Sequence, residues 1–211
     1  MSRLIVLGGG GHGRVVADAA RRTGRWEQIL FLDDAPSRTR AESDFVVLGT
    51  CNDLPQVLRE GDECIVAIGD NAQRRTLLDQ LDAQSAPLAV VIDPSAAVSL
   101  DATLAPGTVV LPQGAVNIGA ELARGCIVNT GATVDHDCRL GECVHIAPGA
   151  HLGGDVVVGD LTWIGIGASV RHGMRIGARA MVGAGAAVVN NVSTGTTVVG
   201  VPARAMGEEK S

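Results

Sequence analysis

The sequence predicts two joined architectures: a small α/β unit with a parallel sheet, and a parallel β-helix that forms a stacked prism. Three observations predict them. Every sixth residue from Ile92 to Val188 is Val, Ile or Leu, seventeen times in succession. Before residue 88, short apolar runs that end in glycine or aspartate alternate with helical segments. The 211 residues include 28 glycines but only two Phe, two Trp and no Tyr, so the core is built from small aliphatic contacts.

Residues 1–88 are expected to form a Rossmann-like unit in which helices cover a small parallel sheet. The expected strands span 4–7, 29–32, 45–48 and 64–68, and the expected helices span 14–22, 53–60 and 72–81.

Residues 89–211 are expected to form the prism and a charged tail. The hexads cover residues 92–193, and three hexads complete one coil of 18 residues. The first and fifth positions of each hexad should point inward, because the fifth is Ala, Gly, Cys or Thr in thirteen of seventeen hexads. The third position should project outward.

Composition excludes several classes of protein. A net charge of −6 leaves no basic stripe that could neutralise nucleic-acid phosphates. No stretch approaches the apolar length of a membrane span, and the apolar run at 4–7 is too short for a signal peptide. The five cysteines include no Cys-x-x-Cys pair and fit small buried side chains in a reducing cytosol. A cytoplasmic protein is therefore expected.

The main polar cluster of the prism is centred on His136. This residue occupies the third, outward position of its hexad and lies between Asp135 and Asp137. An exposed imidazole with a neighbouring carboxylate can act as a general base, although a solvated histidine on a polar face is the alternative. Gly154 lies one coil further along the same column and would leave the backbone beside His136 open to a ligand.

Two further positions are separated by one coil of 18 residues. His145 and Trp163 both end their hexads, so they should stack in one column. His151 and His172 are interpreted as surface histidines.

A glycine-rich turn follows the first expected strand, at residues 8–13. A strand, a glycine turn and a helix N-terminus together can bind phosphate, and Asp33 and Asp34 follow the next strand, where a carboxylate can bind a ribose. NAD and a single nucleotide are both compatible with this pattern, as is a tight turn without a ligand. The unit lacks a second mononucleotide half, so a nucleotide-sugar fits its length better.

Several segments, in order, resemble the bacterial sugar O/N-acetyltransferases of the sialic-acid O-acetyltransferase, bacillosamine N-acetyltransferase and perosamine N-acetyltransferase type. The similar segments are Gly10-Gly11-His12-Gly13, Phe31-Leu32-Asp33-Asp34, Ala67-Ile68-Gly69-Asp70-Asn71, residues 129–138 and Gly200-Val201-Pro202-Ala203. The resemblance implies that the prism is left-handed, against the general rule for parallel crossovers. It also implies a cytoplasmic homotrimer of polysaccharide biosynthesis, with active sites between neighbouring prisms.

The same resemblance assigns roles to individual residues. It implies that His136 is the general base and that Asp137 supports it. It implies acetyl-CoA contacts for His145, Gly154, Ile166 and Ala184, the last of which takes the place of a glycine in the family. It implies that the nucleotide-linked sugar is bound by Gly10, Gly11, His12, Asp33, Asp34, Gly69 and Asn71. No metal is required.

Acetyl-CoA-dependent N-acetylation of a nucleotide-linked 4-amino-4,6-dideoxy sugar is thus the leading hypothesis for function. O-acetylation of a sialic-acid-type sugar would use the same base with a hydroxyl acceptor. A structural solenoid, or a zinc trimer using His136, His145 and His151, is a third hypothesis, but it gives the glycine-rich unit no purpose. The sequence does not distinguish UDP, GDP and dTDP as the nucleotide.

Overall fold

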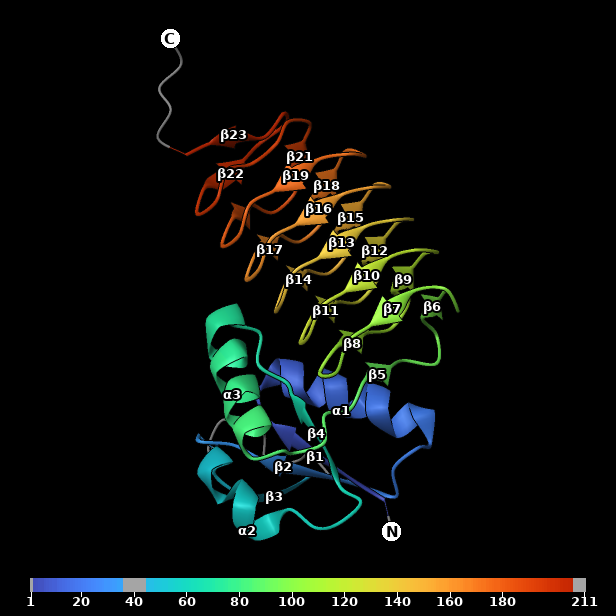
Figure 1. Ribbon diagram of the computed structural model, residues 1–211, viewed down its shortest axis with the longest axis vertical. Coiled ribbons are helices and arrows are strands. Elements are labelled where there is room, and N and C mark those ends of the chain that lie inside the picture. The colour runs from blue at the N-terminus through green and yellow to red at the C-terminus, as the bar shows by residue number, and fades with distance from the viewer. Residues whose placement is uncertain (1, 36–44, 207–211) are drawn as a thin grey trace.

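The computed structural model describes residues 2–35 and 45–206, which form an N-terminal unit and a stacked prism (Figure 1). The elements of the N-terminal unit are β1 (Arg3–Leu7), α1 (Gly11–Thr23), β2 (Gln28–Leu32), β3 (Val46–Gly49), the 3-10 helix η2 (Cys51–Asp53), α2 (Leu54–Val57), β4 (Glu63–Val66) and α3 (Asn71–Ala83). The four strands are parallel in the order β3-β2-β1-β4, as the alternating pattern predicts. The charged tail after Met206 lies outside the described residues.

One expected helix is much shorter than the sequence suggested. The pattern predicted a helix over 53–60, but α2 ends at Val57 because Leu58 adopts an extended conformation with ψ 132°. The reason is a buried ion pair between Arg3 and Asp62. Arg3 Nη2 donates to the Val57 carbonyl at 2.7 Å, and the Asp62 carboxylate accepts from the Arg59 N–H at 2.7 Å. These contacts replace the hydrogen bonds of the next helical turn.

The prism confirms the hexad prediction. Each hexad contributes one two-residue strand that ends on its aliphatic first position, and a corner follows. The strands are β5 (Val91–Ile92), β6 (Ala97–Val98), β7 (Thr103–Leu104), β8 (Val109–Val110), β9 (Ala115–Val116), β10 (Glu121–Leu122), β11 (Ile127–Val128), β12 (Thr133–Val134), β13 (Arg139–Leu140), β14 (His145–Ile146), β15 (His151–Leu152), β16 (Val157–Val158), β17 (Trp163–Ile164), β18 (Ser169–Val170), β19 (Arg175–Ile176), β20 (Met181–Val182) and β21 (Ala187–Val188).

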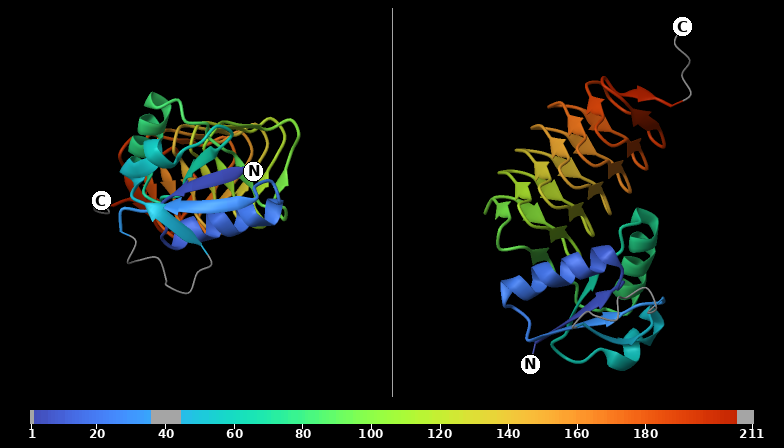
Figure 2. Two further views of the ribbon diagram at one scale, coloured as in Figure 1. Left: turned by 90° about the horizontal axis from the view of Figure 1, so that it is seen from below. Right: turned by 180° about the vertical axis from the view of Figure 1, so that it is seen from behind.

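The strands form three sheets of five, eight and six members, one for each side of the prism (Figure 2). Every strand pairs in parallel with the strand one coil away, so that Val128 lies opposite Ile146 and Ile146 opposite Ile164. The eight-stranded sheet includes β22 (Thr197–Val199), on which β23 (Arg204–Ala205) pairs antiparallel. This last pairing ends the regular stack.

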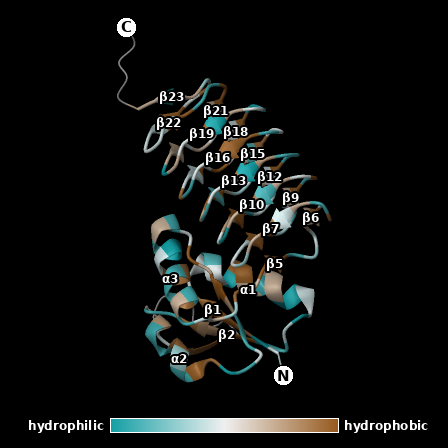
Figure 3. Ribbon diagram, in the orientation of Figure 1, coloured by the Kyte–Doolittle hydropathy of each residue, from teal (hydrophilic) through white to brown (hydrophobic). Residues whose placement is uncertain are grey.

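Most inward positions are apolar and buried, although Thr108 and Thr162 also point inward and Met174 is half-buried. Apolar and polar residues alternate along the ribbon (Figure 3). In the first coil, Ile92 is 36% exposed and Val98 and Leu104 are half-buried, because no coil of the described residues lies beneath them. Many corners contain a fourth-position residue with positive φ, which is Gly at most of these sites.

The outward third positions form three edges of the prism. The α3 edge joins the five- and eight-stranded sheets and consists of Pro106, Arg124, Glu142, Asp160 and Ala178. The Ile166 edge joins the eight- and six-stranded sheets and consists of Pro94, Pro112, Thr130, Pro148, Ile166 and Ala184. The His136 edge joins the six- and five-stranded sheets and consists of Leu100, Ile118, His136, Gly154, His172 and Asn190.

The N-terminal unit packs directly on the prism. Buried residues of β1 and α1 share one apolar cluster with Val109 and Ile127, which face outward from the eight-stranded sheet. Helix α3 stands along the α3 edge (Figure 1), where Arg75 binds Glu142 at 2.9 Å and Arg124 binds Asp79 and Asp82. Among the described residues, no helix is both long enough and apolar enough to span a bilayer.

Candidate functional site

The His136 side chain lies exposed at the corner between β12 and β13. Its Nδ1 is 2.8 Å from Asp137 Oδ2, and its backbone N–H donates to Asp135 Oδ1 at 2.8 Å. Because a carboxylate only accepts, Nδ1 bears a proton, and in the neutral ring Nε2 keeps its lone pair. The hydrogen bond that Nδ1 donates to Asp137 is the main reason that the pKa of His136 is raised above its usual value.

Two glycines make room for this pair of side chains. A Cβ on Gly154 would lie 2.3 Å from His136 Nε2, and one on Gly119 would lie 2.5 Å from Asp137 Oδ1. The space over Gly154 is therefore filled by the imidazole of His136 itself. Asp137 adopts φ 57° at a corner position where glycine is common. A non-glycine residue there costs roughly 1 kcal/mol, which the hydrogen bond between the carboxylate and His136 offsets.

His145 lies on β14, buried on the face of the prism that meets the N-terminal unit. Its Nδ1 faces the Gly69 carbonyl at 3.4 Å, and its Nε2 faces Asn129 Nδ2 at 3.0 Å. Asn129 Oδ1 accepts from the Thr130 N–H, so the amide nitrogen is the group turned toward the imidazole. His145 thus has Nδ1 protonated and Nε2 accepting. Burial, with a contribution from Arg74, lowers its pKa to about 3, so the ring is neutral.

The predicted stacking of His145 and Trp163 is confirmed. The two residues are paired in register on β14 and β17, and their ring centroids are 4.1 Å apart. His12 also lies near His145, with 6.0 Å between the ring centroids. Burial is the main reason that the pKa of His12 is lowered to about 4, and its Nε2 has no hydrogen-bond partner among the described residues.

Arg74 is a central residue that the sequence did not single out. It is fully buried in α3, where it has five hydrogen bonds. Its guanidinium donates to the carbonyls of Gly125, Ile68, Gly69 and Cys143 and to Asn71 Oδ1, at 2.7–3.0 Å. The signal in the sequence was its position. The buried face of α3 is Asn71, Arg74, Leu78 and Leu81, and a charged residue stands there where an apolar one is usual.

The residues predicted to bind a nucleotide-linked sugar gather where β1, β2 and β4 end. A Cβ on Gly10 or Gly11 would meet no atom within 4 Å, so the backbone there is open to close approach. Gly13 differs, because a Cβ there would lie 1.9 Å from the Gly8 carbonyl oxygen. Asp33 accepts from the Gly9 and Ala35 N–H groups and so shapes the turn itself.

The other predicted members of this set divide into two groups. Asp34 is exposed and accepts from the Cys51 N–H at 2.9 Å. His12, Gly69 and Asn71 lie at the junction with the prism. Asn71 Nδ2 donates to the carbonyls of Leu161 and Thr162, at 3.0 and 3.1 Å, so its amide joins the two parts of the chain.

Ile166 and Ala184 lie exposed on the Ile166 edge, one coil apart. Neither backbone N–H donates a hydrogen bond to any described residue, whereas those of neighbouring Gly165, Gly167 and Gly185 do. The two amides are therefore donors available to an extended ligand that has amide carbonyls.

The chain does not bring all the predicted site residues together. His145 faces outward from the eight-stranded sheet, whereas His136 lies on the edge between the other two sheets. The two histidines thus lie on different sides of the same prism. Across residues 2–35 and 45–206, no three His, Cys, Asp or Glu side chains group in a way that could hold a metal ion.

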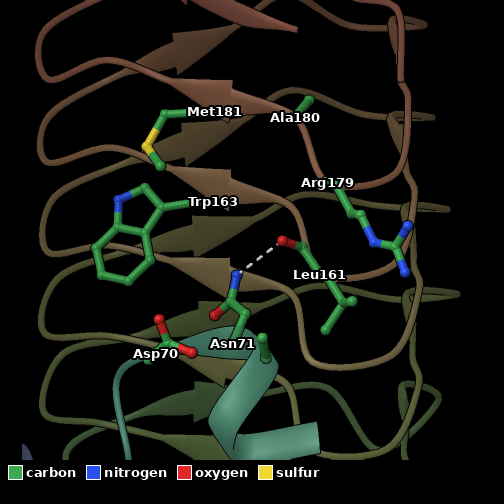
Figure 4. Close-up of a pocket in the computed structure, with 8 residues that line it drawn as sticks. Asp70, Asn71, Leu161, Trp163, Arg179, Ala180 and Met181 are labelled. Carbon is green, nitrogen blue, oxygen red and sulfur yellow. Dashed lines mark hydrogen bonds between the residues drawn. The ribbon is translucent and has the colours of Figure 1, made fainter. Parts of the chain in front are cut away.

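A cavity of about 530 Å³ lies between the first turn of α3 and the eight-stranded sheet (Figure 4). Its lining is Asp70, Asn71, Ala72, Leu161, Trp163, Arg179, Ala180 and Met181.

Comparison with known proteins places this architecture in a family. Residues 3–81 match the model of the PglD N-terminal domain. The chain is 41% identical to the acetyltransferase domain of PglB from Neisseria gonorrhoeae, with a TM-score of 0.92, covering 97% of this chain and 99% of that one. It is 37% identical to PerB from Caulobacter crescentus in complex with CoA and GDP-perosamine, with a TM-score of 0.91 and 97% of each chain covered.

The chain belongs to this family of sugar N-acetyltransferases. WeeI from Acinetobacter baumannii is more distant, at 25% identity, with a TM-score of 0.89 and 98% of this chain and 100% of that one covered. No curated protein matches the sequence. The prism of this acetyltransferase is a left-handed parallel β-helix, as the resemblance implied.

Proposed function

We propose that this acetyltransferase transfers the acetyl group of acetyl-CoA to the amino group of a nucleotide-linked 4-amino-4,6-dideoxy sugar. Residues 1–88 would bind the nucleotide-linked sugar, and residues 89–211 would bind acetyl-CoA. The observation that carries the proposal is the geometry of His136, whose ring is exposed while Asp137 accepts the hydrogen bond from Nδ1, so that Nε2 of the neutral ring can take a proton. PerB, a relative of similar length, was crystallised with CoA and GDP-perosamine. An N-acetylated nucleotide sugar is a building block of polysaccharides, so we assign this acetyltransferase to polysaccharide biosynthesis.

The chemistry requires one base. The amine nitrogen attacks the thioester carbonyl carbon, a C–N bond forms, and the C–S bond breaks to release the CoA thiolate. His136 Nε2 takes the proton that the amine loses and returns it to the thiolate. Asp137 stabilises the imidazolium in between, and positioning of the two substrates supplies most of the remaining rate.

A trimer would complete the site. His136 and His145 lie on different sides of one prism, so a site that uses both needs a second copy of the chain. The His136 edge also exposes Leu100, which is fully accessible, and Ile118, which is 57% exposed. Apolar side chains on an edge are typical of a surface that packs on another subunit. We therefore assign this edge to contacts within a homotrimer.

Acetyl-CoA fits the Ile166 edge of the subunit that provides His145. The unused N–H groups of Ile166 and Ala184 can donate to amide carbonyls of the pantetheine arm. Ala184 contributes through its backbone, so a Cβ there is compatible with this contact. His145, held neutral and flanked by Trp163, would lie near the acetyl end. The opening that the sequence suggested over Gly154 is filled by the imidazole of His136, so Gly154 would seat that ring rather than admit the thioester.

The experiment is a thiol-release assay with acetyl-CoA and a panel of UDP-, GDP- and dTDP-linked 4-amino-4,6-dideoxy sugars, with hydroxyl acceptors run in parallel. His136→Ala should lower kcat by at least about 10²-fold, which is the usual scale of general-base catalysis. His172→Ala is the matched control, since His172 lies two coils along the same edge and is exposed. Equal rates for both variants would contradict the mechanism, and faster release with hydroxyl acceptors would contradict N-acetylation.

A further inference from the structure

The outward column of the six-stranded sheet consists of small, uncharged side chains around one histidine. Its members pair in register from one coil to the next and are Ala97, Ala115, Thr133, His151, Ser169 and Ala187. The five-stranded sheet differs, because its column contains the exposed charges of Glu121, Arg139 and Arg175. The eight-stranded sheet is partly covered by the N-terminal unit. The six-stranded face is therefore the open face with the least bulk and charge to hold a second copy of the chain away.

The proposed trimer turns this face toward its threefold axis. Its active site joins the His136 edge of one copy to the Ile166 edge of the next, and these two edges are the borders of the six-stranded sheet. In a closed ring of three copies, each six-stranded sheet then runs from one junction to the next and faces either the axis or the outside. The third edge bears α3 and the N-terminal unit, which leave no room for it at the axis (Figure 1). The three six-stranded sheets therefore enclose the axis.

The His151 side chain is exposed on β15 and contacts the residue one coil earlier in its column. Its Nδ1 lies 3.0 Å from Thr133 Oγ1. Because a hydroxyl oxygen can accept, Nδ1 can bear the proton of the neutral ring, which leaves the lone pair on Nε2. That is the tautomer of a metal-bound histidine, whose second nitrogen usually donates to a neighbouring acceptor. Nε2 itself has no hydrogen-bond partner among the described residues.

The size of the prism brings three copies of this imidazole close together. One side of the prism is one hexad long, which gives roughly 20 Å at about 3.3 Å per residue. Three such sides that meet at their corners enclose a triangle with an inscribed radius of about 6 Å. That radius is close to the length of a histidine side chain plus a Zn–N bond of about 2.0 Å.

We infer that three His151 side chains, one from each copy, form a binding site for a divalent transition-metal ion on the threefold axis, which we call the axial site. This inference rests on the trimer of the proposed function. Three neutral imidazoles and a water molecule match the tetrahedral coordination of Zn²⁺. Each copy supplies one ligand, so the site exists only in the trimer, and the described part of one chain groups no three such side chains.

The axial site is separate from the catalytic base. His136 lies on an edge of the prism and is hydrogen-bonded to Asp137, whereas His151 lies on a sheet between two edges. His145 is buried on the face that meets the N-terminal unit. The three different histidines of one chain therefore do not meet at one ion. A metal ion in the axial site holds three copies together, and acetyl transfer should proceed with or without it.

Cross-linking tests whether the six-stranded face lies at the axis. Ser169 follows His151 in its column and is exposed, whereas Arg175 is exposed on the five-stranded sheet. In the full-length protein, a short bis-maleimide should join Ser169→Cys chains into covalent dimers on a denaturing gel. Arg175→Cys is the matched control and should stay monomeric, as should wild type, whose cysteines are buried or half-buried. Equal cross-linking of the two variants, or none in Ser169→Cys, would overturn the inference.

Metal binding is measured on tag-free, full-length protein that is stripped with EDTA, equilibrated with Zn²⁺ and desalted. Wild type should hold one zinc ion per three chains, and His151→Ala should hold almost none. His172→Ala is the matched control, because His172 is exposed on the His136 edge, and it should keep the full amount. Equal zinc in wild type and His151→Ala would rule out the axial site.

A second pair of variants tests the contact that orients the ring. Thr133→Val removes the acceptor for Nδ1 and should weaken zinc binding about 10- to 100-fold, the usual effect of losing such a partner. Ser169→Ala changes the residue on the other side of His151 and should leave zinc affinity unchanged. Equal zinc affinities for these two variants would contradict the role of Thr133.

Thiol release separates this inference from the proposed function. One zinc ion per three chains without acetyl transfer supports the axial site and overturns the proposed reaction. Acetyl transfer by a wild-type protein that binds no zinc through His151 overturns the axial site and leaves the reaction standing. His151→Ala should release thiol at the wild-type rate, with and without EDTA. A rate that falls in step with the loss of zinc would place the ion in the reaction and contradict its separation from His136.

Discussion

Replacing Arg74 should loosen the attachment of the N-terminal unit to the prism. The guanidinium has no carboxylate partner among its hydrogen bonds, and all five acceptors are neutral oxygens. Three acceptors, on Ile68, Gly69 and Asn71, belong to the segment leading into α3, and the other two belong to the prism. Arg74 therefore joins both parts through one buried charge.

The magnitude follows from these contacts. A hydrogen bond to a charged group contributes about 1.5–3 kcal/mol, but the five are not additive and the cost of burying the cation offsets part of them. Arg74→Met, which keeps the volume and removes every donor, should lower the free energy of unfolding by about 3–5 kcal/mol. For a chain of this length, that corresponds to a fall in Tm of roughly 10 °C. Arg74→Lys retains the charge and up to three donors, so its loss should be about half as large.

Urea unfolding at one fixed protomer concentration is the assay, because association shifts apparent stability. The reasoning predicts a lower midpoint for Arg74→Met, with separation into two transitions as the N-terminal unit unfolds first. A loss of unfolding free energy below about 1 kcal/mol, with one unchanged transition, would refute the role of Arg74 in joining the N-terminal unit to the prism.

Arg74→Met should also change how the stability of the protein depends on pH. Burial is the main cause of the low pKa values of His145 and His12, about 3 and about 4, and Arg74 contributes to both. Both values lie below the unfolded value, so the unfolded chain binds more protons in acid. Stability should therefore fall as pH drops from about 6.5 through these values. Arg74→Met should raise both pKa values without restoring the unfolded value, because burial remains, and the fall with pH should become shallower. NMR titration of the two imidazoles measures this directly.

Four further substitutions test the site. Gly154→Ala places a methyl group 2.3 Å from His136 Nε2. Because the imidazole is exposed and can swing away, Tm should stay unchanged while kcat falls by about 10²-fold. Normal activity would disprove the close fit of His136 over Gly154. Asp137→Asn removes the main cause of the raised pKa of His136. In the pH profile of kcat/KM, the acid limb should therefore move to lower pH and the plateau should fall. An acid limb that does not move would show that the Asp137 carboxylate does not set the pKa of His136. Gly13→Ala should destabilise the fold by about 3 kcal/mol or more, because its Cβ would overlap a backbone carbonyl. Gly11→Ala should leave unfolding unchanged and raise KM for the nucleotide sugar. Equal unfolding midpoints for the two variants would contradict the different roles of these glycines.

The hexad pattern predicted the prism, its 18-residue coil and the stack of His145 on Trp163, because parallel pairing repeats the same local geometry at every coil. The pattern could not predict what covers the outward column. Whether an outward residue is buried, as His145 is, or half-exposed, as Trp163 is, depends on where the N-terminal unit lies against the prism. The orientation of that unit depends on Arg74, whose partners are 51 and 69 residues away in the chain. Such contacts leave no periodic signal.

The three edges explain how a monotonous repeat can hold different functions. Core packing restricts the residue types at the first and fifth positions of every hexad, and the turn of the chain restricts those at the corner. The third position faces outward, so its residue type is free to vary. On one edge this freedom provides the Arg124 and Glu142 side chains that bind α3. On the second it leaves the amide of Ile166 unused, and on the third it places His136 beside apolar Ile118. Since a parallel stack keeps each edge in register, the residues of one edge can change without disturbing the core or the other two edges.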